Sequence, residues 1–338
     1  MDPTVILGLS GGVDSAVAAR LLREAGHRVH GLYLDIGLPR GREEAAAAAA
    51  SLGIPLTVRD IRAALEERVC APFAAAYCRG ETPNPCILCN PAVKFRALLE
   101  LADGLGAPWV ATGHYAALRD GALCKGRPEN DQSYMLCRLE RSQVARLLLP
   151  LGHYTKVQVR AMAADFGLPV AGKPDSMEIC FIPDGDYAAW LERRGCACPP
   201  GDLLDENGQV IGRHRGIHRY TLGQRRGLGF AAGRRVFVSD IDPARNTVTL
   251  SGGDGLWVSE AFAGDVNWLE TPLEGPFRAM VKIRHSRGET PALVTPTEGG
   301  VQLRFETPVR APVPGQSAVG YLGERLVFGG VLRGAGTG

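Results

Sequence analysis

The chain has 338 residues, of which 45% are hydrophobic and 22% charged, a composition that excludes wholesale disorder. At this length we expect two or three domains rather than a single hydrophobic core. The net charge of +2 excludes a global attraction to polyanions, so any surface that binds nucleic acid must be local.

The sequence gives no signal for export or membrane insertion. A structured motif begins almost at once after Thr4, which leaves no room for a secretory signal, and no apolar run approaches the roughly 20 residues that cross a bilayer. Nine cysteines, an odd and moderate number, fit a reducing compartment better than a disulfide framework. We therefore expect a cytoplasmic protein without a membrane role.

Short β-rich runs alternate with helical stretches along the first half of the chain. The expected strands cover 4–9, 29–34, 56–58 and 109–112, and the expected helices cover 13–25, 43–52, 92–102 and 155–166. This alternation is typical of βαβ units. It predicts an α/β, Rossmann-like domain with a parallel sheet and helices on both faces.

The composition changes around residues 196–201, where Pro and Gly cluster. Many turn signals follow between short strand-like runs, and from residue 258 onward short strands recur with Pro and Gly between them. We predict a catalytic domain over 1–198, a small middle domain over 199–257 and a C-terminal β-barrel over 258–338.

The first strand runs directly into Ser10-Gly-Gly-Val-Asp-Ser, which opens a helix. The adjacent glycines let several backbone N–H groups face one anion, and the helix N-terminus adds partial positive charge. The two serines supply hydroxyl donors, and Asp14 is placed to hold Mg²⁺ against phosphates. The segment is neither a Walker A loop nor a dinucleotide fingerprint. It is similar to the PP-loop of ATP pyrophosphatases, which cleave ATP to AMP and pyrophosphate.

Three cysteines lie in sequence contexts that favour reactivity. Cys86 and Cys89 follow a Pro-rich turn and precede a helix with Lys94 and Arg96, so the helix N-terminus and these cations are expected to stabilise a thiolate. Cys180 follows turn residues that predict a surface loop. The alternatives are half a zinc site for the first pair and a small buried apolar residue for Cys180. The other cysteines, at 70, 78, 124, 137, 196 and 198, are interpreted as structural.

Six motifs resemble, in order and spacing, those of the tRNA 2-thiouridylase family. They are Ser10-Gly-Gly-Val-Asp-Ser, Asn84-Pro-Cys-Ile-Leu-Cys-Asn, Ala111-Thr-Gly-His-Tyr-Ala, Asp131-Gln-Ser-Tyr, Asp175-Ser-Met-Glu-Ile-Cys-Phe-Ile and Tyr220-Thr-Leu-Gly-Gln-Arg-Arg. Each motif alone is short, but six in sequence make chance agreement implausible. The resemblance covers nearly the whole chain, and the family's three-part architecture fits the predicted domains.

The resemblance implies a role for each of these sites. The implied ATP-binding residues are Gly8, Leu9, Ser10, Gly11, Gly12, Val13, Asp14, Ser15, Leu34 and Gly113. The implied tRNA-binding residues are Asn84, Pro85, Cys86, His114, Asn130, Asp131, Gln132, Arg284, His285 and Gln316. Cys180 would receive sulfur as a persulfide from a donor protein, Cys89 would be its partner nucleophile, and Asp14 and Cys86 complete the catalytic set. The expected partners are tRNAs for Lys, Glu and Gln.

The implied reaction replaces the C2 oxygen of a wobble uridine with sulfur. That oxygen attacks the α-phosphate of ATP and releases pyrophosphate, and the sulfur carried on Cys180 then displaces AMP, directly or as sulfide freed by Cys89. The two cysteines must therefore approach each other. The target base must also leave the anticodon stack, which suits recognition of a single-stranded RNA loop.

Two positions depart from the family pattern. Many relatives carry Asp at the position of Cys86, so this chain cannot use that carboxylate for proton transfer. We therefore hypothesise that Cys86, Cys89 and Cys180 hold a [4Fe–4S] cluster with one iron open to sulfide, and the rival hypothesis is the persulfide route with a spare thiol. Asn130 stands where Lys is frequent, which weakens one phosphate contact.

Residues 213–226 carry five arginines without a carboxylate among them and predict contact with RNA phosphates. Two other functions stay open. The first is a PP-loop enzyme that activates a small-molecule carboxylate for amidation and needs no pair of reactive thiols. The second is a non-catalytic RNA-binding protein that retains the fold.

Overall fold

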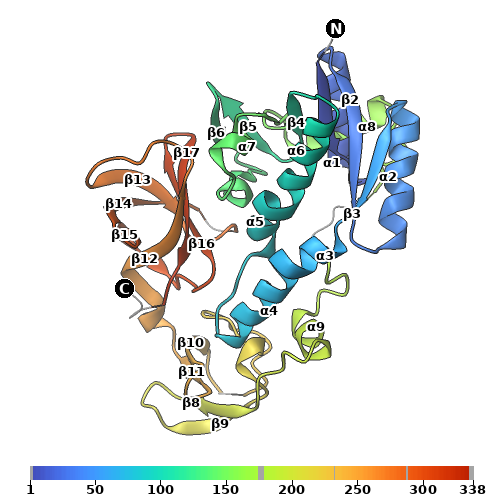
Figure 1. The fold of residues 1–338 in the computed structure, drawn as a ribbon. Helices are drawn as coiled ribbons and strands as arrows, with labels where there is room; N and C mark the ends of the chain where they lie inside the picture. The colour runs from blue at the N-terminus through green and yellow to red at the C-terminus, as the bar shows by residue number, and fades with distance from the viewer. Residues whose placement is uncertain (1–2, 174–178, 232, 287, 335–338) are drawn as a thin grey trace. The chain divides into compact units, whose positions relative to one another are not determined.

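The computed structural model describes residues 3–173, 179–231, 233–286 and 288–334. The start of the Asp175 motif, residues 175–178, therefore lies outside the described residues. The chain divides into two compact units (Figure 1). Unit 1 contains the residues up to Val69, Cys86–Phe181 and Glu324–Val327, and unit 2 contains Cys70–Pro85, Ile182–Gly323 and the residues from Phe328 onward. No helix among the described residues is both long and apolar enough to cross a membrane.

Unit 1 is built on a parallel sheet, as the βαβ pattern predicts. Its strands are β1 (Thr4–Gly8), β2 (Arg28–Asp35), β3 (Leu56–Asp60), β4 (Trp109–Ala111) and β7 (Leu147–Leu148), in the order β3-β2-β1-β4-β7. Strand β1 is central, and its Val5 pairs with Val29 on one side and with Trp109 on the other. The side chains of Val5, Ile6 and Leu7 are fully buried because helices cover both faces.

The helices of unit 1 lie on opposite faces of this sheet (Figure 1). The helices α1 (Val13–Glu24), α2 (Pro39–Leu52) and α8 (Lys156–Asp165) share one core with the alternate residues Val5 and Leu7 of β1. Helix α6 (Arg96–Gly104) covers the other face, where its Leu98 approaches Gly8. The predicted α/β architecture with two covered faces is therefore confirmed.

Unit 1 also contains elements that the sequence analysis does not predict. They are α3 (Arg62–Leu65), α7 (Arg141–Val144), the 3₁₀ turn η3 (Ser133–Leu136), the π-helix η1 (Glu66–Cys70) and a hairpin of β5 (Ala116–Arg119) and β6 (Ala122–Lys125). The hairpin turns at Asp120 and Gly121, which both have positive φ, as the tight turn between twisted strands requires.

The expected helix over 92–102 is wrong in its first part. The chain instead forms α5 (Pro85–Cys89), a π-helix η2 (Asn90–Phe95) and then α6. Pro91 explains the change, because proline has no N–H for the regular helical bond and its ring clashes with the carbonyl four residues earlier. The wider π turn accommodates this break without ending the helical path.

Unit 2 begins with a small mixed sheet. Its elements are α4 (Ala71–Cys78), α9 (Tyr187–Arg193), η4 (Ile217–Arg219), and the strands β8 (Gly201–Leu204), β9 (Val210–His214), β10 (Phe237–Asp242) and β11 (Thr247–Ser251) in the order β10-β11-β8-β9. Leu203, Val238, Val248 and Leu250 form its core. These strands agree with the predicted small middle region, and the domain limits at 198 and 257 stay predictions.

Unit 2 ends in a closed barrel, as predicted. After the short turn η5 (Asp254–Leu256) come β12 (Trp257–Trp268), β13 (Phe277–Lys282), β14 (Thr290–Thr297), β15 (Gly300–Arg310), β16 (Ser317–Leu322) and β17 (Arg325–Leu332). The strand order is β12-β15-β14-β13-β16-β17, and β17 pairs again with β12. Because β12 and β17 pair with each other, neither strand has an unpaired edge where the barrel closes.

Gly320 of β16 is a test of the barrel packing. A Cβ added there would overlap the ring of Phe328, which is itself fully buried and cannot move aside. We expect Gly320→Ala to lower the free energy of unfolding by about 1–3 kcal/mol, measured by urea denaturation. Gly255→Ala is the control because a Cβ there meets open space. Equal stability of the two variants would contradict this packing.

Candidate active site

The phosphate loop is held by its own side chains. The Ser15 hydroxyl, which is buried, donates to the carbonyl of Gly12 at 3.1 Å and accepts from the backbone N–H of Ser10 at 3.2 Å. Gly11 adopts φ +73°, a conformation that favours glycine. The loop is therefore shaped before any ligand arrives, and its curl is the one expected for binding an anion at the start of α1.

Two glycines permit close backbone approaches at this loop. A Cβ on Gly11 would lie 2.7 Å from the backbone nitrogen of Ala45 in α2. A Cβ on Gly113, which follows β4, would lie 3.0 Å from the backbone of Asp14 and Ser15. Strands β1 and β4 are parallel neighbours, so the loop and Gly113 lie together at the carboxyl ends of the strands, where ligands of such sheets bind.

The carboxylate of Asp14 is already paired. Lys156 Nζ contacts its two oxygens at 2.6 and 2.7 Å, and the Tyr115 hydroxyl donates to it at 2.6 Å. An ammonium group thus occupies one side of the carboxylate that was expected to hold Mg²⁺, and the Mg²⁺ site stays a prediction. Lys156 is 142 positions from Asp14, so no local sequence pattern reveals this pairing.

A second lysine contacts the phosphate loop. Lys173 Nζ donates to the carbonyl of Gly11 at 3.1 Å and pairs with Glu44 of α2. Two ammonium groups thus lie at the loop, each partly neutralised by one carboxylate. A negatively charged ligand would find both cations within reach of the loop, which strengthens its assignment as an anion site.

The candidate thiols influence one another electrostatically. Cys86 and Cys180 are exposed, and Cys89 is half-buried at the end of α5. Desolvation raises the pKa of the Cys180 thiol to about 11, helped by Cys89 and Cys86 and opposed by the cation of Lys94. These three cysteines and Lys94 therefore form one local cluster, which we call the thiol cluster.

The expected acidification of Cys89 is wrong. Burial raises the pKa of its thiol, and the opposing effects of the Lys94 cation and the Lys94 backbone N–H do not overcome it. Cys89 is the last residue of α5 and directly precedes the π-helix η2, which carries Lys94 as expected. Neutral thiol is therefore the resting form of Cys89, and Lys94 is the group that favours its ionisation.

His114 connects the phosphate loop with the thiol cluster. It directly follows Gly113, its Nδ1 is 2.8 Å from the hydroxyl of Thr112, and its ring stacks on Phe95 with centroids 6.2 Å apart. Burial lowers the pKa of its imidazole well below the usual range, and the nearby Lys94 cation lowers it further. His114 is therefore a neutral imidazole at physiological pH.

The proposed cluster ligands are not preassembled. Among the residues that the structure describes, no three His, Cys, Asp or Glu side chains are grouped so that they could hold a metal ion. Cys86, Cys89 and Cys180 are near enough to affect one another's ionisation but do not converge on one point in this way. The [4Fe–4S] hypothesis stays a prediction that requires these thiols to rearrange.

Three of the residues expected to bind tRNA hold a turn in unit 1. Asp131 accepts from the backbone of Gly126 at 2.9 Å and of Ser133 at 3.0 Å. Gln132 exchanges hydrogen bonds with the backbone of Tyr115 at 2.8 and 3.0 Å. Asn130 accepts from the backbone N–H of Lys156 at 3.2 Å. Asn130 and Gln132 thus help to position Lys156 and Tyr115, which contact Asp14, and tRNA contact by all three residues stays a prediction.

The other expected tRNA residues lie mostly in unit 2. Arg284 donates to the carbonyls of Leu222 and Ala311 at 3.1 and 2.9 Å. Gln316 donates to the carbonyl of Thr82 at 2.6 Å. His285 is exposed, Asn84 is half-buried and Pro85 is buried. Leu34 of unit 1, the expected adenine neighbour, is half-buried at the end of β2.

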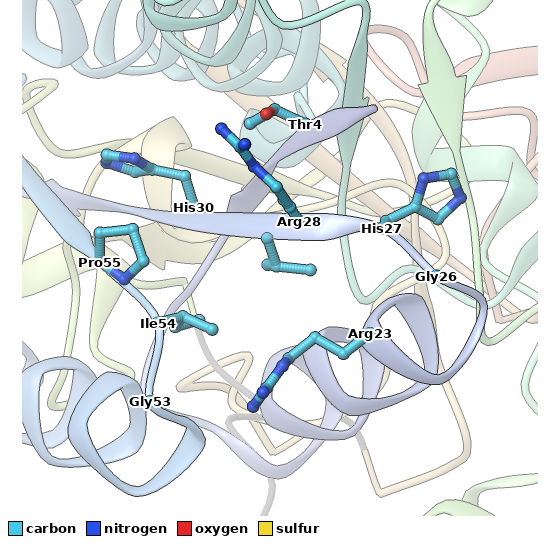
Figure 2. Close-up of a pocket in the computed structure, with 10 residues that line it drawn as sticks. Thr4, Arg23, Gly26, His27, Arg28, His30, Gly53, Ile54 and Pro55 are labelled. Carbon is cyan, nitrogen blue, oxygen red and sulfur yellow. The ribbon is translucent and has the colours of Figure 1, made fainter. Parts of the chain in front are cut away.

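A cavity of about 490 Å³ lies at the amino ends of the strands in unit 1, opposite the end that carries the phosphate loop (Figure 2). It is lined by the start of β2, including His27, Arg28 and His30, and by Arg23 at the end of α1. The phosphate loop follows the carboxyl end of β1, so it lies at the opposite end of the parallel strands from this cavity. This cavity is therefore not part of the candidate active site.

Comparison with protein families divides the chain into three matched regions. A model described as a tRNA methyl transferase HUP domain matches residues 3–184, a tRNA methyl transferase PRC-barrel domain matches 190–252, and an aminomethyltransferase beta-barrel domain matches 258–332. The fold and the loop thus define a HUP-domain protein that carries a PRC-barrel domain and a C-terminal β-barrel.

Curated relatives cover nearly the full chain. Proteins named tRNA-specific 2-thiouridylase MnmA are 44% identical in Pelotomaculum thermopropionicum and 43% in Acidithiobacillus ferrooxidans, over 98% of this chain and 98% and 99% of those proteins. The relative of that name in Desulforudis audaxviator is 44% identical over 97% of this chain and 98% of its own length. The chain belongs to the tRNA-specific 2-thiouridylase family.

The raised pKa of Cys180 predicts its reactivity. Because the pKa is about 11, the thiolate fraction is small at neutral pH and the alkylation rate should rise about tenfold per pH unit between about pH 7 and 9.5. Lys94→Met removes a cation that lowers the pKa of Cys89 and Cys180, so both should be alkylated several-fold more slowly at a fixed pH.

Peptide mass spectrometry after timed treatment with iodoacetamide measures these rates. Arg96→Met is the matched control, because Arg96 is an exposed cation nearby in sequence that pairs with Glu100. A rate for Cys180 that levels off below about pH 9 would contradict the assigned desolvation. So would an equal effect of the Lys94 and Arg96 substitutions.

Proposed function

We propose that this chain catalyses the ATP-dependent 2-thiolation of a tRNA wobble uridine. The observation that carries the proposal is the short path from the phosphate loop to the thiol cluster within unit 1. Gly113 lies against Asp14 of the loop, His114 is the next residue, and Lys94 acts on both His114 and the thiols. Nucleotide activation and sulfur transfer therefore share one locality, which the family membership independently supports.

The phosphate loop is proposed to bind ATP and to release pyrophosphate. The residues from Gly8 to Ser15 supply backbone N–H groups and hydroxyls, Gly113 lies against the loop backbone, and Leu34 lies by the adenine. Lys156 and Lys173 supply charge that offsets the phosphates. The uridine C2 oxygen attacks the α-phosphate, which makes C2 electrophilic.

The thiol cluster is proposed to deliver sulfur to the activated base. Cys180 accepts sulfur as a persulfide from a donor protein. Cys89 attacks the Cys180 sulfur, either of the persulfide, which frees sulfide, or of the adduct formed when the outer sulfur has attacked C2, which frees the thiolated base. Both routes leave a Cys89–Cys180 disulfide, which an external thiol reduces before the next turnover. Burial holds both groups as thiols at rest, and the cation of Lys94 stabilises the thiolate when one forms. Displacement of AMP from C2 then completes the exchange of oxygen for sulfur.

The remaining assignments are proposed in the same scheme. Asn84, Pro85, Cys86 and His114 surround the extruded base, and tRNAs for Lys, Glu and Gln are the substrates, modified in the cytoplasm. The set Asn130, Asp131, Gln132, Arg284, His285 and Gln316 contacts the tRNA. Mg²⁺ and the [4Fe–4S] cluster are assigned no step, because Asp14 is paired with Lys156 and the cysteines are not grouped as metal ligands within the described residues.

Cys180→Ser separates the two half-reactions. With sulfur supplied as a protein persulfide, we expect 2-thiouridine formation to fall more than about a hundredfold, because the sulfur carrier is lost. Pyrophosphate release that depends on tRNA should persist, because the phosphate loop is intact. Nucleoside mass spectrometry and a coupled pyrophosphate assay measure the two outcomes.

Cys196→Ser is the matched control, since it removes another partly buried thiol from unit 2 and should leave both half-reactions unchanged. Thiolation that survives in Cys180→Ser would refute the assigned carrier. Pyrophosphate release without tRNA, directed at a small carboxylate, would instead establish the amidation alternative.

Lys156→Met tests the electrostatics of the loop. Removal of the ammonium leaves Asp14 as an uncompensated negative charge near the phosphates, so the KM for ATP should rise about tenfold, or about 1.4 kcal/mol. Arg20→Met is the control, because it breaks an exposed pair with Glu24 on the same helix. An unchanged KM in Lys156→Met would show that the pair does not face the nucleotide.

A further inference from the structure

A second group of cysteines belongs to unit 2. Cys78 is the last residue of α4, and Cys196 and Cys198 lie on the segment between α9 and β8. The thiol of Cys78 donates to the carbonyl of Cys196 at 3.8 Å, although 118 positions separate the two residues. All three are free cysteines. Nothing in the thiolation scheme uses them.

The thiols of Cys78 and Cys198 lie near each other. Cys198 is two residues beyond the carbonyl that the Cys78 thiol contacts, and burial followed by the Cys198 thiol raises the pKa of Cys78. Cys78 is exposed to solvent, whereas Cys198 is half-buried. Because the Cys78 thiol already contacts this segment at 3.8 Å, a small movement of the segment can bring the two sulfur atoms to the separation of a disulfide. The pair is thus arranged for oxidation, with one partner open to an external reagent.

Aromatic packing holds the two segments in place. Tyr77, next to Cys78, stacks on Tyr187 of α9 with ring centroids 4.8 Å apart. Phe73 of α4 meets Trp190 of α9 edge-on at 5.9 Å. These contacts fix the end of α4 against α9, so the approach of the thiols follows from packing of the whole unit rather than from a mobile loop.

The backbone of Cys198 is fixed as well. Its N–H donates to Nδ1 of the buried His218 at 3.2 Å, and Nε2 of that ring is 3.0 Å from the carboxylate of Glu192. A Cβ on Gly216 would lie 2.5 Å from the carbonyl oxygen of Cys198, so this glycine permits the close approach. Cys198 is therefore held at its position beside Cys78.

A metal site is the other use that three cysteines and a histidine suggest. Both ring nitrogens of His218 are engaged, one by the Cys198 backbone and one by Glu192, so neither is open to a metal. No three potential ligands in the described part of the chain are grouped to hold an ion. The geometry favours a dithiol over a zinc site.

We propose that Cys78 and Cys198 form a reversible disulfide by exchange with a low-molecular-weight disulfide, such as oxidised glutathione. The Cys78 thiolate attacks one sulfur of the reagent, which forms a mixed disulfide and releases one small thiol. The Cys198 thiolate then attacks the Cys78 sulfur and releases the second small thiol. Two electrons pass from the protein to the reagent, and the two thiol protons leave with the released thiols.

The disulfide joins the end of α4 to the segment that enters β8. Its closed loop spans more than a third of the chain, so the bond restricts the unfolded state strongly and stabilises unit 2. Reduction by a small thiol reverses the step. The pair is therefore a site at which the redox poise of the surroundings alters the stability of the protein.

The full chain, equilibrated with mixtures of reduced and oxidised glutathione and then alkylated, tests the proposal. Under oxidising mixtures, peptide mass spectrometry should detect the Cys78 peptide linked to the Cys198 peptide, about 2 Da lighter than the two free peptides together. The Tm should rise by several degrees, and dithiothreitol should reverse both effects.

Matched variants decide which thiol takes part. Cys198→Ser should abolish the linked peptide and the Tm shift, and Cys196→Ser should retain both. Cys78→Ser provides a second test if Cys198→Ser does not fold. The proposal is overturned if Cys78 carries only glutathione at every mixture, if the link persists in Cys198→Ser, or if the purified protein holds stoichiometric zinc.

Discussion

The close approach of Gly113 to the N-terminus of α1 is the constraint on which the candidate site depends. A Cβ at this position would lie 3.0 Å from the backbone of Asp14 and Ser15, so glycine lets the chain after β4 pack tightly against the phosphate loop. Because His114 comes next, the same contact sets the position of an imidazole whose environment includes Lys94 of the thiol cluster. Anion binding and thiol chemistry are thereby coupled through adjacent residues of one strand end.

Burial and charge act in opposite directions in the two halves of this site. At the phosphate loop, two lysines with only partial compensation create a region that accepts negative charge. In the thiol cluster, desolvation disfavours charge on Cys89 and Cys180, and one cation, Lys94, counteracts it. The same cation keeps His114 neutral. Lys94 thus biases three ionisable groups at once, in favour of thiolates and against an imidazolium.

Local patterns predicted the fold well, and they predicted the site only in part. Strand and helix periodicity, together with the glycine loop, depends on neighbouring residues and was visible in the sequence. The pairing of Lys156 with Asp14 joins residues 142 positions apart, which no local pattern reveals. The expected thiolate at Cys89 was wrong because burial, a tertiary property, outweighs nearby cations. The resemblance implied tRNA contact for Asp131 but not the turn that its carboxylate organises.

The π-helix between Cys89 and α6 has a geometric consequence for the thiols. An α-helix turns about 100° per residue, so the wider turn at Asn90–Phe95 absorbs roughly one residue of rotation between α5 and α6. Leu98 packs helix α6 against the sheet. The π segment therefore determines the direction around the helix axis in which Cys86 and Cys89 project. A chain one residue shorter here would keep α6 on the sheet but rotate Cys86 and Cys89 by about 100° relative to that core.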